Sequence, residues 1–277
     1  MKRRILPLIG ALLILLSACS PKEPAPTAVP TPSEVPAPTV SQTPEPAPTP
    51  VPTQAPAPVW GEQVSECSRS SEGEDEVLLV SGRFSLPLIE NADGVAAYEA
   101  INDFYLDLSA GLRSDTLANA AQAAEDYSLS KAMDFPFSSY SDEETFALKR
   151  ETPRMVSILR THYGYTGGVY PTVLYLADNF DLATGRELAF ADFFTDPDAA
   201  ESLIRSTLQT AAEHGVEDEE AARLTALLER FNRENFYLTD DAVVFFTQPD
   251  PDTPHAAGAV EGSVSYATLG GLLVDWS

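Results

Sequence analysis

Positive charge is scarce in this chain of 277 residues. Lysine and arginine together number 17, against 42 aspartates and glutamates, so the formal net charge is −25 at pH 7. Removing residues 1–18, which carry three cations and no anion, leaves −28 on the remaining chain. Nucleic acids and anionic lipid surfaces repel such a chain, and we expect neither as a partner. The acidity is compatible with a cationic protein partner, or with solubility alone.

Cysteine is almost absent as well. The two cysteines are Cys19 and Cys67. We expect Cys19 to be modified, which excludes an intrachain disulfide and leaves the fold to depend on its hydrophobic core. The 218 residues from Trp60 to Ser277 suffice for one large domain or two small ones.

The apolar run at the N terminus is too short to cross a bilayer. Residues 5–16 are apolar and follow a basic head at residues 2–4, whereas a spanning helix needs about 20 apolar residues. This pattern is typical of a secretion signal. Its end, Leu-Ser-Ala-Cys at residues 16–19, resembles a bacterial lipobox. The resemblance implies lipidation of Cys19 and cleavage before it, because several acyl chains hold a protein at a membrane. The alternative is an ordinary signal peptide in which Cys19 is incidental.

Residues 20–59 lack aromatic residues and hold 14 of the 23 prolines. Such a segment cannot bury a core, and we predict a disordered, extended tether over residues 19–59. At roughly 3.1 Å per residue in polyproline II it spans on the order of 100 Å. Its Pro-x-x-Pro spacings also fit an aromatic groove, but the spacer interpretation is favoured outside the cell.

Hydrophobic periodicity after residue 60 predicts an α+β protein with a largely antiparallel sheet packed by helices. The expected strands are residues 76–89 (a strand pair or one bent strand), 146–151, 155–165, 172–182, 187–194, 236–248 and 262–273. The expected helices are residues 95–112, 117–131 (a continuation or a second helix), one that begins at Asp198, and 219–232. We expect Asp198 to cap its helix with Glu201 as capping-box partner, Gly185 to adopt a positive φ, and Asp240-Asp241 to form a hairpin turn.

The segment HYGYTGGVYP, residues 162–171, is the first candidate site. Its glycines lack the spacing of a phosphate loop. His162 has no histidine or cysteine at ligand spacing, so a metal site would require His162, His214 and His255 to converge in space. No Gly-x-Ser-x-Gly nucleophile motif occurs, and Cys67 has no basic neighbour beyond Arg69. We therefore predict no catalytic residue, no metal and no cofactor.

The same segment fits a bend between two antiparallel strands better than it fits a reactive loop. In this interpretation Gly167 and Gly168 make the bend, and Tyr163, Tyr165 and Tyr170 pack alternately on the two faces of the sheet. A binding role is the best functional alternative, because tyrosine rings stack on sugars and anchor protein partners. The proline-rich loop 248–258, with Pro254 and His255, is a second candidate binding surface.

Four motifs occur in an order that resembles a known family. They are Tyr-Thr-Gly-Gly at residues 165–168, Phe-Asp-Leu-Ala-Thr-Gly at 180–185, Phe-Tyr-Leu-Thr-Asp at 236–240, and Pro-His-Ala-Ala-Gly at 254–258. Together they resemble the C-terminal domain of unknown function of lysozyme-sensing anti-sigma factors (RsiV-like) and of certain cell-wall polysaccharide deacetylases (PdaC-like). The resemblance assigns residues 151–277 to that domain and residues 60–150 to the companion domain that usually precedes it. Relatives commonly carry Ala-His where this chain has Val169-Tyr170, and an aromatic residue at His255.

An anti-sigma factor also needs a cytoplasmic domain and a membrane span, and a deacetylase needs a catalytic module; we expect neither in this chain. The leading hypothesis is a non-catalytic, lipid-anchored binding or sensing protein on the outer face of the cell membrane of a Gram-positive bacterium. Its expected ligand is lysozyme or peptidoglycan. The first alternative is an envelope hydrolase, which convergence of His162 or His255 with two acidic side chains would favour. The second is a structural spacer protein without a small ligand.

Overall fold

The computed structural model describes residues 55–73, 76–214, 218–249 and 259–277. These residues lie in one compact unit, Thr53–Ser277. The predicted lipidation site Cys19, most of the predicted tether, and Pro254 and His255 fall outside the described residues. In the part of the chain that is described, no helix combines the length and the apolar character needed to span a membrane.

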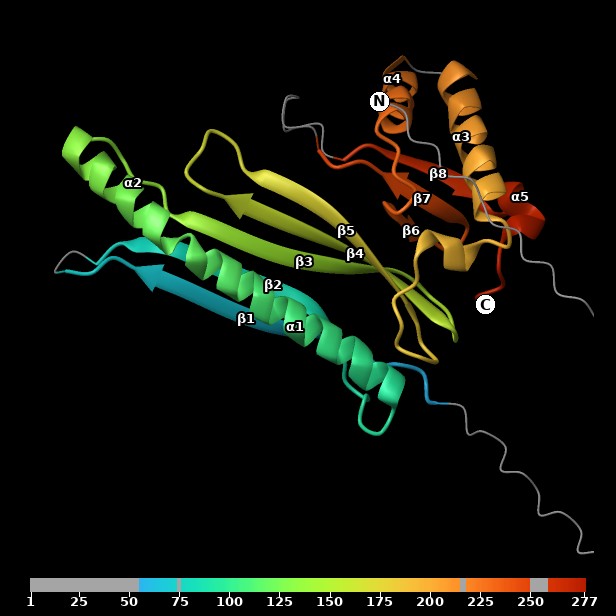
Figure 1. The fold of residues 1–277 in the computed structure, drawn as a ribbon, viewed down its shortest axis with the longest axis horizontal. Helices are drawn as coiled ribbons and strands as arrows, with labels where there is room; N and C mark the ends of the chain where they lie inside the picture. The colour runs from blue at the N-terminus through green and yellow to red at the C-terminus, as the bar shows by residue number, and fades with distance from the viewer. Residues whose placement is uncertain (1–54, 74–75, 215–217, 250–258) are drawn as a thin grey trace, which may run out of the picture. The chain divides into compact units, whose positions relative to one another are not determined.

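A five-stranded sheet forms the first half of the fold, in the order β1-β2-β3-β4-β5 (Figure 1). Its strands are β1 (Trp60–Ser70), β2 (Leu78–Ile89), β3 (Tyr140–Glu151), β4 (Met155–Tyr165) and β5 (Thr172–Asp181). All neighbours pair antiparallel except β2 and β3. A parallel pair needs a long crossover, which α1 (Ala96–Ala118) and α2 (Ala120–Met133) supply.

The two crossover helices cover one face of this sheet. On α1, Ile101 and Tyr105 are fully buried against Leu86 of β2, Val156 of β4 and Phe180 of β5. The small residues of α2 that face the sheet let that helix approach it closely, and Tyr140 of β3 packs in the same cluster. The spacing of the apolar residues on α1 is the three- and four-residue spacing of an amphipathic helix, as the sequence predicts.

A second, three-stranded sheet forms the C-terminal half, with β6 (Phe236–Leu238), β7 (Ala242–Phe246) and β8 (Glu261–Ser265), all antiparallel. Its core includes buried residues of α3 (Pro197–His214) and α4 (Asp218–Glu229). On the opposite side, Tyr237, Val244 and Phe246 pack against Leu159 of β4. The backbone N–H of Leu238 also donates to Ser157 Oγ of β4 at 2.9 Å. The predicted α+β class with a largely antiparallel sheet is confirmed.

The structure departs from the predicted elements in three places. β1 is not among the predicted strands, because its few apolar residues give no strong alternation. Residues 187–194 form no strand; they contain the 3-10 turn η1 (Phe190–Phe193), which buries both of its phenylalanines. The last predicted strand ends at Ser265, where the short helix α5 (Tyr266–Leu269) begins.

Of the three predictions about turns and helix caps, two are confirmed and one is wrong. Gly185 has φ +72°, as predicted, and a Cβ there would lie 2.5 Å from the carbonyl oxygen of Ala97. Asp240-Asp241 forms the hairpin turn between β6 and β7, as predicted. The predicted cap at Asp198 is wrong: Asp196 Oδ1 accepts from the N–H of Ala199 at 3.0 Å, and α3 begins at Pro197.

The predicted domain boundary at residue 150 falls inside β3. That strand pairs with β4 on both sides of the boundary, from Ser141 opposite Tyr165 to Glu151 opposite Val156.

Candidate functional site

The glycine-containing segment of the first candidate site is a bend, as predicted. It joins β4 to β5, which pair antiparallel, and Gly167 adopts φ +80°, a conformation that favours glycine. Gly167 lies on the ring of Tyr140, because a Cβ there would be 3.2 Å from Tyr140 Cε1. At this bend, Val169 is 85 % exposed and Tyr170 is 63 % exposed. We call residues 166–171 the hairpin tip.

The predicted alternation of the tyrosines is wrong. Tyr163 and Tyr165 are two residues apart on β4, and side chains at that spacing point to the same face of a strand. Tyr170 lies in the tip itself. Of the predicted binding residues, the structure therefore places Tyr163, Tyr165, Gly167, Gly168 and Tyr170 in one hairpin. Pro254 and His255 lie outside the described residues, so the second candidate surface has no structural placement.

On the helix-covered face, β3, β4 and β5 hold a buried charge cluster that the sequence analysis missed. Arg160 Nε lies 2.6 Å from Asp178 Oδ2, and Arg160 Nη1 lies 2.5 Å from Glu144 Oε1. Glu144 is only 1 % exposed. From α1, the Tyr105 hydroxyl donates to Asp178 Oδ2 at 3.0 Å. A buried charge is tolerated only when it is paired, and this arrangement pairs all three.

The cluster continues to His162 on β4. Its Nδ1 lies 2.9 Å from Glu144 Oε2, and its Nε2 lies 4.0 Å from Asp142 Oδ1. The hydroxyl of Thr116 on α1 donates to Asp142 Oδ2 at 2.6 Å. The signal in the sequence was the two-residue spacing of Asp142 and Glu144, and of Arg160 and His162. It became meaningful only once the strand order placed these residues on adjacent strands.

The environment of the cluster shifts its proton affinities. The hydrogen bond to Glu144 raises the pKa of His162 above its ordinary value, and this outweighs the opposing effect of burial. Burial, then the negative charge of Asp178, raises the pKa of the Tyr105 hydroxyl. Burial also raises the pKa of the Cys67 thiol, which lowers the fraction of reactive thiolate. In the described part of the chain, no three His, Cys, Asp or Glu residues are grouped to hold a metal ion.

His162 should make the stability of the fold depend on pH. Because its folded-state pKa is raised, its contribution is fully present below the unfolded value of about 6.5 and is lost as the pH rises through the folded value. We expect His162→Gln to remove this component of the fall in unfolding free energy as the pH rises above about 6.5. Urea denaturation at each pH measures it. His214→Gln, at the exposed end of α3, is the matched control and should retain the wild-type dependence. An unchanged pH profile in His162→Gln would contradict the assignment.

The face of the five-stranded sheet opposite α1 is covered by the three-stranded sheet over β4 and β5, where Leu159 and Ala177 pack. We call its remaining part, on β1 to β4, the open face. Two adjoining hollows of about 470 and 300 Å³ lie on it. Ser141 and Glu143 line both hollows, which therefore join into one polar groove that reaches Tyr163.

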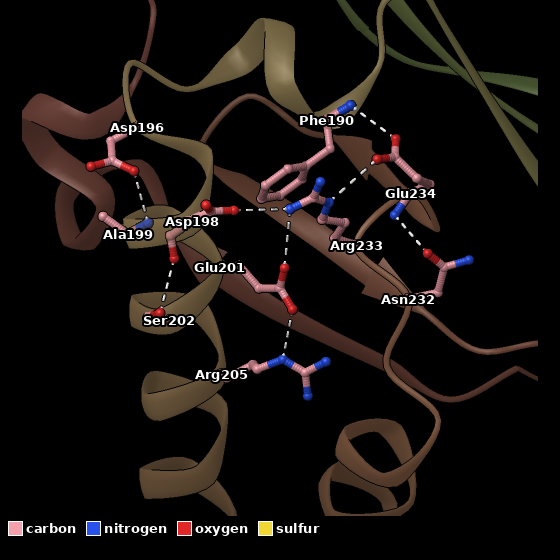
Figure 2. Close-up of polar contacts among 10 residues, drawn as sticks. All are labelled: Phe190, Asp196, Asp198, Ala199, Glu201, Ser202, Arg205, Asn232, Arg233 and Glu234. Carbon is pink, nitrogen blue, oxygen red and sulfur yellow. Dashed lines mark hydrogen bonds and ion pairs between the residues drawn. The ribbon is translucent and has the colours of Figure 1, made fainter. Parts of the chain in front are cut away.

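A separate ion-pair network connects α3 to the segment after α4 (Figure 2). Arg233 Nη1 lies 3.4 Å from Asp198 Oδ1 and 3.3 Å from Glu201 Oε2, and Glu201 also binds Arg205 at 2.9 Å. Glu234 accepts from the backbone N–H of Phe190 at 3.0 Å, which fixes the start of η1. These charged side chains are paired but reach solvent, from 27 % exposed for Glu201 to 94 % for Asp198, so the network anchors the segment and contributes modestly to stability.

Comparison with known protein families finds a match in this C-terminal part. Residues 191–267 match the model of the family described as "Protein of unknown function (DUF3298)". This segment is a DUF3298 domain. It runs from η1 into α5 and includes all the charged residues of the ion-pair network. Phe190, whose backbone N–H binds Glu234, lies just before it. The buried charge cluster and the polar groove lie outside the DUF3298 segment, on the five-stranded sheet.

Two solved structures of DUF3298 family proteins share the fold over a longer stretch. One, from Bacteroides fragilis, is 16 % identical, with a TM-score of 0.58 over 79 % of this chain and 95 % of that chain. The other, from Pseudomonas aeruginosa, is 16 % identical, with a TM-score of 0.53 over 80 % of this chain and 96 % of that chain. The fold shared with DUF3298 proteins thus extends beyond the DUF3298 segment itself. No curated protein matches the chain.

Proposed function

We propose that this protein is a lipid-anchored, RsiV-like binding or sensing protein on the outer face of a bacterial cell membrane, and that it is non-catalytic. The proposal includes the companion domain at residues 60–150 and a ligand that is either lysozyme or peptidoglycan. The DUF3298 domain supports the family part of the proposal, and the basic, apolar and Leu-Ser-Ala-Cys sequence of residues 2–19 supports the anchor.

The hairpin tip is the observation that carries the binding role. Val169 and Tyr170 expose most of their surface, and both are among the most exposed large apolar or aromatic side chains in the described part of the chain. The bend below them is held by Gly167 on the Tyr140 ring, so the tip is presented by an ordered support. Exposed aromatic side chains on an ordered support are typical anchors of protein and sugar recognition. The net charge of −25 favours a cationic partner.

Binding of the unlipidated chain (Cys19→Ser) to lysozyme in solution and to insoluble peptidoglycan tests this function. We expect at least one of the two to bind, and Val169→Ser with Tyr170→Ser to weaken that binding by about tenfold or more. Leu106→Ser on α1 is the control, because Leu106 is a comparably exposed apolar residue away from the tip. If neither lysozyme nor peptidoglycan binds, the proposed function is wrong.

The anchor has its own test. Mass spectrometry of the N-terminal peptide from the native protein should find acyl chains on Cys19, and Cys19→Ser should release the protein from the membrane fraction. An unmodified Cys19, or the protein in the cell interior, would exclude the anchor without bearing on the fold.

The envelope hydrolase is kept as a second candidate, because His162 meets two acidic side chains, Glu144 and Asp142. A carboxylate that orients a histidine is a feature of many hydrolytic sites. It ranks second because Glu144 is committed to Arg160 and His162 lines neither hollow of the groove. Release of soluble fragments from peptidoglycan by the purified chain, and its loss in His162→Gln with binding retained, would put the hydrolase first.

A further inference from the structure

The register of the strands places polar side chains in two rows across the open face. Opposed residues of neighbouring strands point to the same face, so a row crosses the sheet at right angles to its strands. The first row is Glu66, Arg83, Glu143 and Tyr163, on β1, β2, β3 and β4 in turn. The second is Ser68, Ser81, Ser141 and Tyr165 on the same strands. Each row ends in a tyrosine.

The side chains of the two rows differ in length, and this difference creates the groove. The three serine side chains of the second row are short, whereas the longer side chains of Glu66, Arg83 and Glu143 in the first row project further from the sheet beside them. Strands favour β-branched and aromatic residues, so a row of serines brings little packing. The joined hollows of about 470 and 300 Å³ match the size of sites for small ligands.

We propose that this polar groove binds a glycan chain that carries no anionic group, with the Tyr163 ring as its stacking platform. The inference rests on the proposed function and assigns it a second surface, distinct from the hairpin tip. Serine and threonine hydroxyls both donate and accept, carboxylates accept, and the Arg83 guanidinium donates, which matches the mixed hydroxyls of a sugar. Tyr163 is 36 % exposed and offers the flat surface on which the apolar face of a sugar ring stacks.

The lining favours a glycan over other polymers. Its side chains include no aliphatic residue, so a protein partner would find no apolar anchor there other than Tyr163. Two carboxylates, Glu66 and Glu143, stand in the groove against the single cation Arg83, which is itself paired with Glu66. The Asp142 carboxylate lies on the other face of the sheet, with Thr116 and His162. Nucleic acids and anionic glycans would be repelled, whereas charge complementarity favours amine-bearing sugars over uncharged ones.

Calorimetry on the unlipidated chain with defined oligosaccharides tests the groove. The probes are a chitin tetrasaccharide, which is uncharged, its amine-bearing chitosan counterpart, and an anionic hyaluronan tetrasaccharide. We expect the chitosan probe to bind most tightly and the hyaluronan probe not at all. Tyr163→Ala should weaken chitin binding about three- to tenfold, the range of one stacking contact, and Glu143→Gln about tenfold. Glu143 and Tyr163 are exposed, so thermal unfolding should confirm that both variants fold.

Matched controls separate the groove from charge and from exposed apolar surface elsewhere. Glu219→Gln on α4 removes the same charge as Glu143→Gln at a distant site, and Leu106→Ala removes an exposed apolar side chain from α1, which covers the opposite face of the sheet; both should leave chitin binding unchanged. If the wild type binds neither chitin nor chitosan, or the groove variants bind like the wild type, the inference is wrong. Lysozyme or peptidoglycan binding that persists in such a case would leave the proposed function standing. Loss of oligosaccharide binding only in Tyr170→Ala would move the glycan to the tip.

Discussion

Arg160→Met should lower the free energy of unfolding by about 3–5 kcal/mol, the range for removing one partner of a buried ion pair. Methionine fills a similar volume but leaves Glu144 and Asp178 as buried carboxylates without their cation. Glu144 would keep only the hydrogen bond from His162, and Asp178 only that from Tyr105. The effect therefore comes from desolvated charge rather than from lost packing.

Urea denaturation of the unlipidated chain at pH 7 measures this change. The matched control is Arg83→Met, which removes an exposed ion pair with Glu66 and should cost less than about 1 kcal/mol. Adding Glu144→Gln and Asp178→Asn to Arg160→Met should restore part of the stability, because no buried charge then remains. An Arg160→Met protein as stable as Arg83→Met would contradict this prediction and show that water solvates the carboxylates of the cluster.

Phe245→Ala should destabilise the C-terminal half by a comparable amount, about 3–5 kcal/mol. Phe245 is buried in β7, and its ring centroid lies 5.1 Å from that of Phe231 and 6.0 Å from that of Phe236. Removing the ring leaves a cavity between the three-stranded sheet and its helices. Phe135→Ala, at an exposed phenylalanine, should be nearly neutral.

The two tryptophans of the chain allow this variant to report on cooperativity. Trp60 packs in the core of the five-stranded sheet and Trp276 in that of the three-stranded sheet. Ser157 and Leu159 of β4 connect the two sheets, so we expect the two halves to unfold together. The fluorescence of Trp60 and that of Trp276, each followed alone after the other tryptophan is replaced by phenylalanine, should then show the same unfolding transition. An earlier transition at Trp276 only would mean that the two halves unfold independently.

The sequence predicted those elements whose signal is local. The spacing of Ile101, Tyr105 and their neighbours predicts α1, and Gly185 predicts its own turn, because each depends on a few adjacent residues. The bend at Gly167-Gly168 was predicted for the same reason. The apolar alternation of residues 187–194 was misleading, since a 3-10 turn buries Phe190 and Phe193 equally well.

The candidate site depends on contacts that no local pattern contains. β1 resembles a polar loop, and only its pairing with β2 along its whole length makes it a strand. Arg160 is 16 residues from Glu144 and 18 from Asp178 in sequence, and the antiparallel pairings of β3 with β4 and of β4 with β5 bring the three together. The rows of the polar groove depend in addition on the parallel pairing of β2 with β3. The RsiV-like subtype, the ligand and the anchor remain predictions.

The strand register also determines how the molecule would respond to pulling. Trp60, where the chain enters the fold, lies opposite Ile89, whereas the hairpin tip lies at the other end of the sheet, where Tyr165 is opposite Ser141. A ligand held at the tip and an anchor at the N terminus would therefore stretch β1 along its own axis. The hydrogen bonds between β1 and β2 would then share the load in shear instead of opening one by one, which is the mechanically resistant direction.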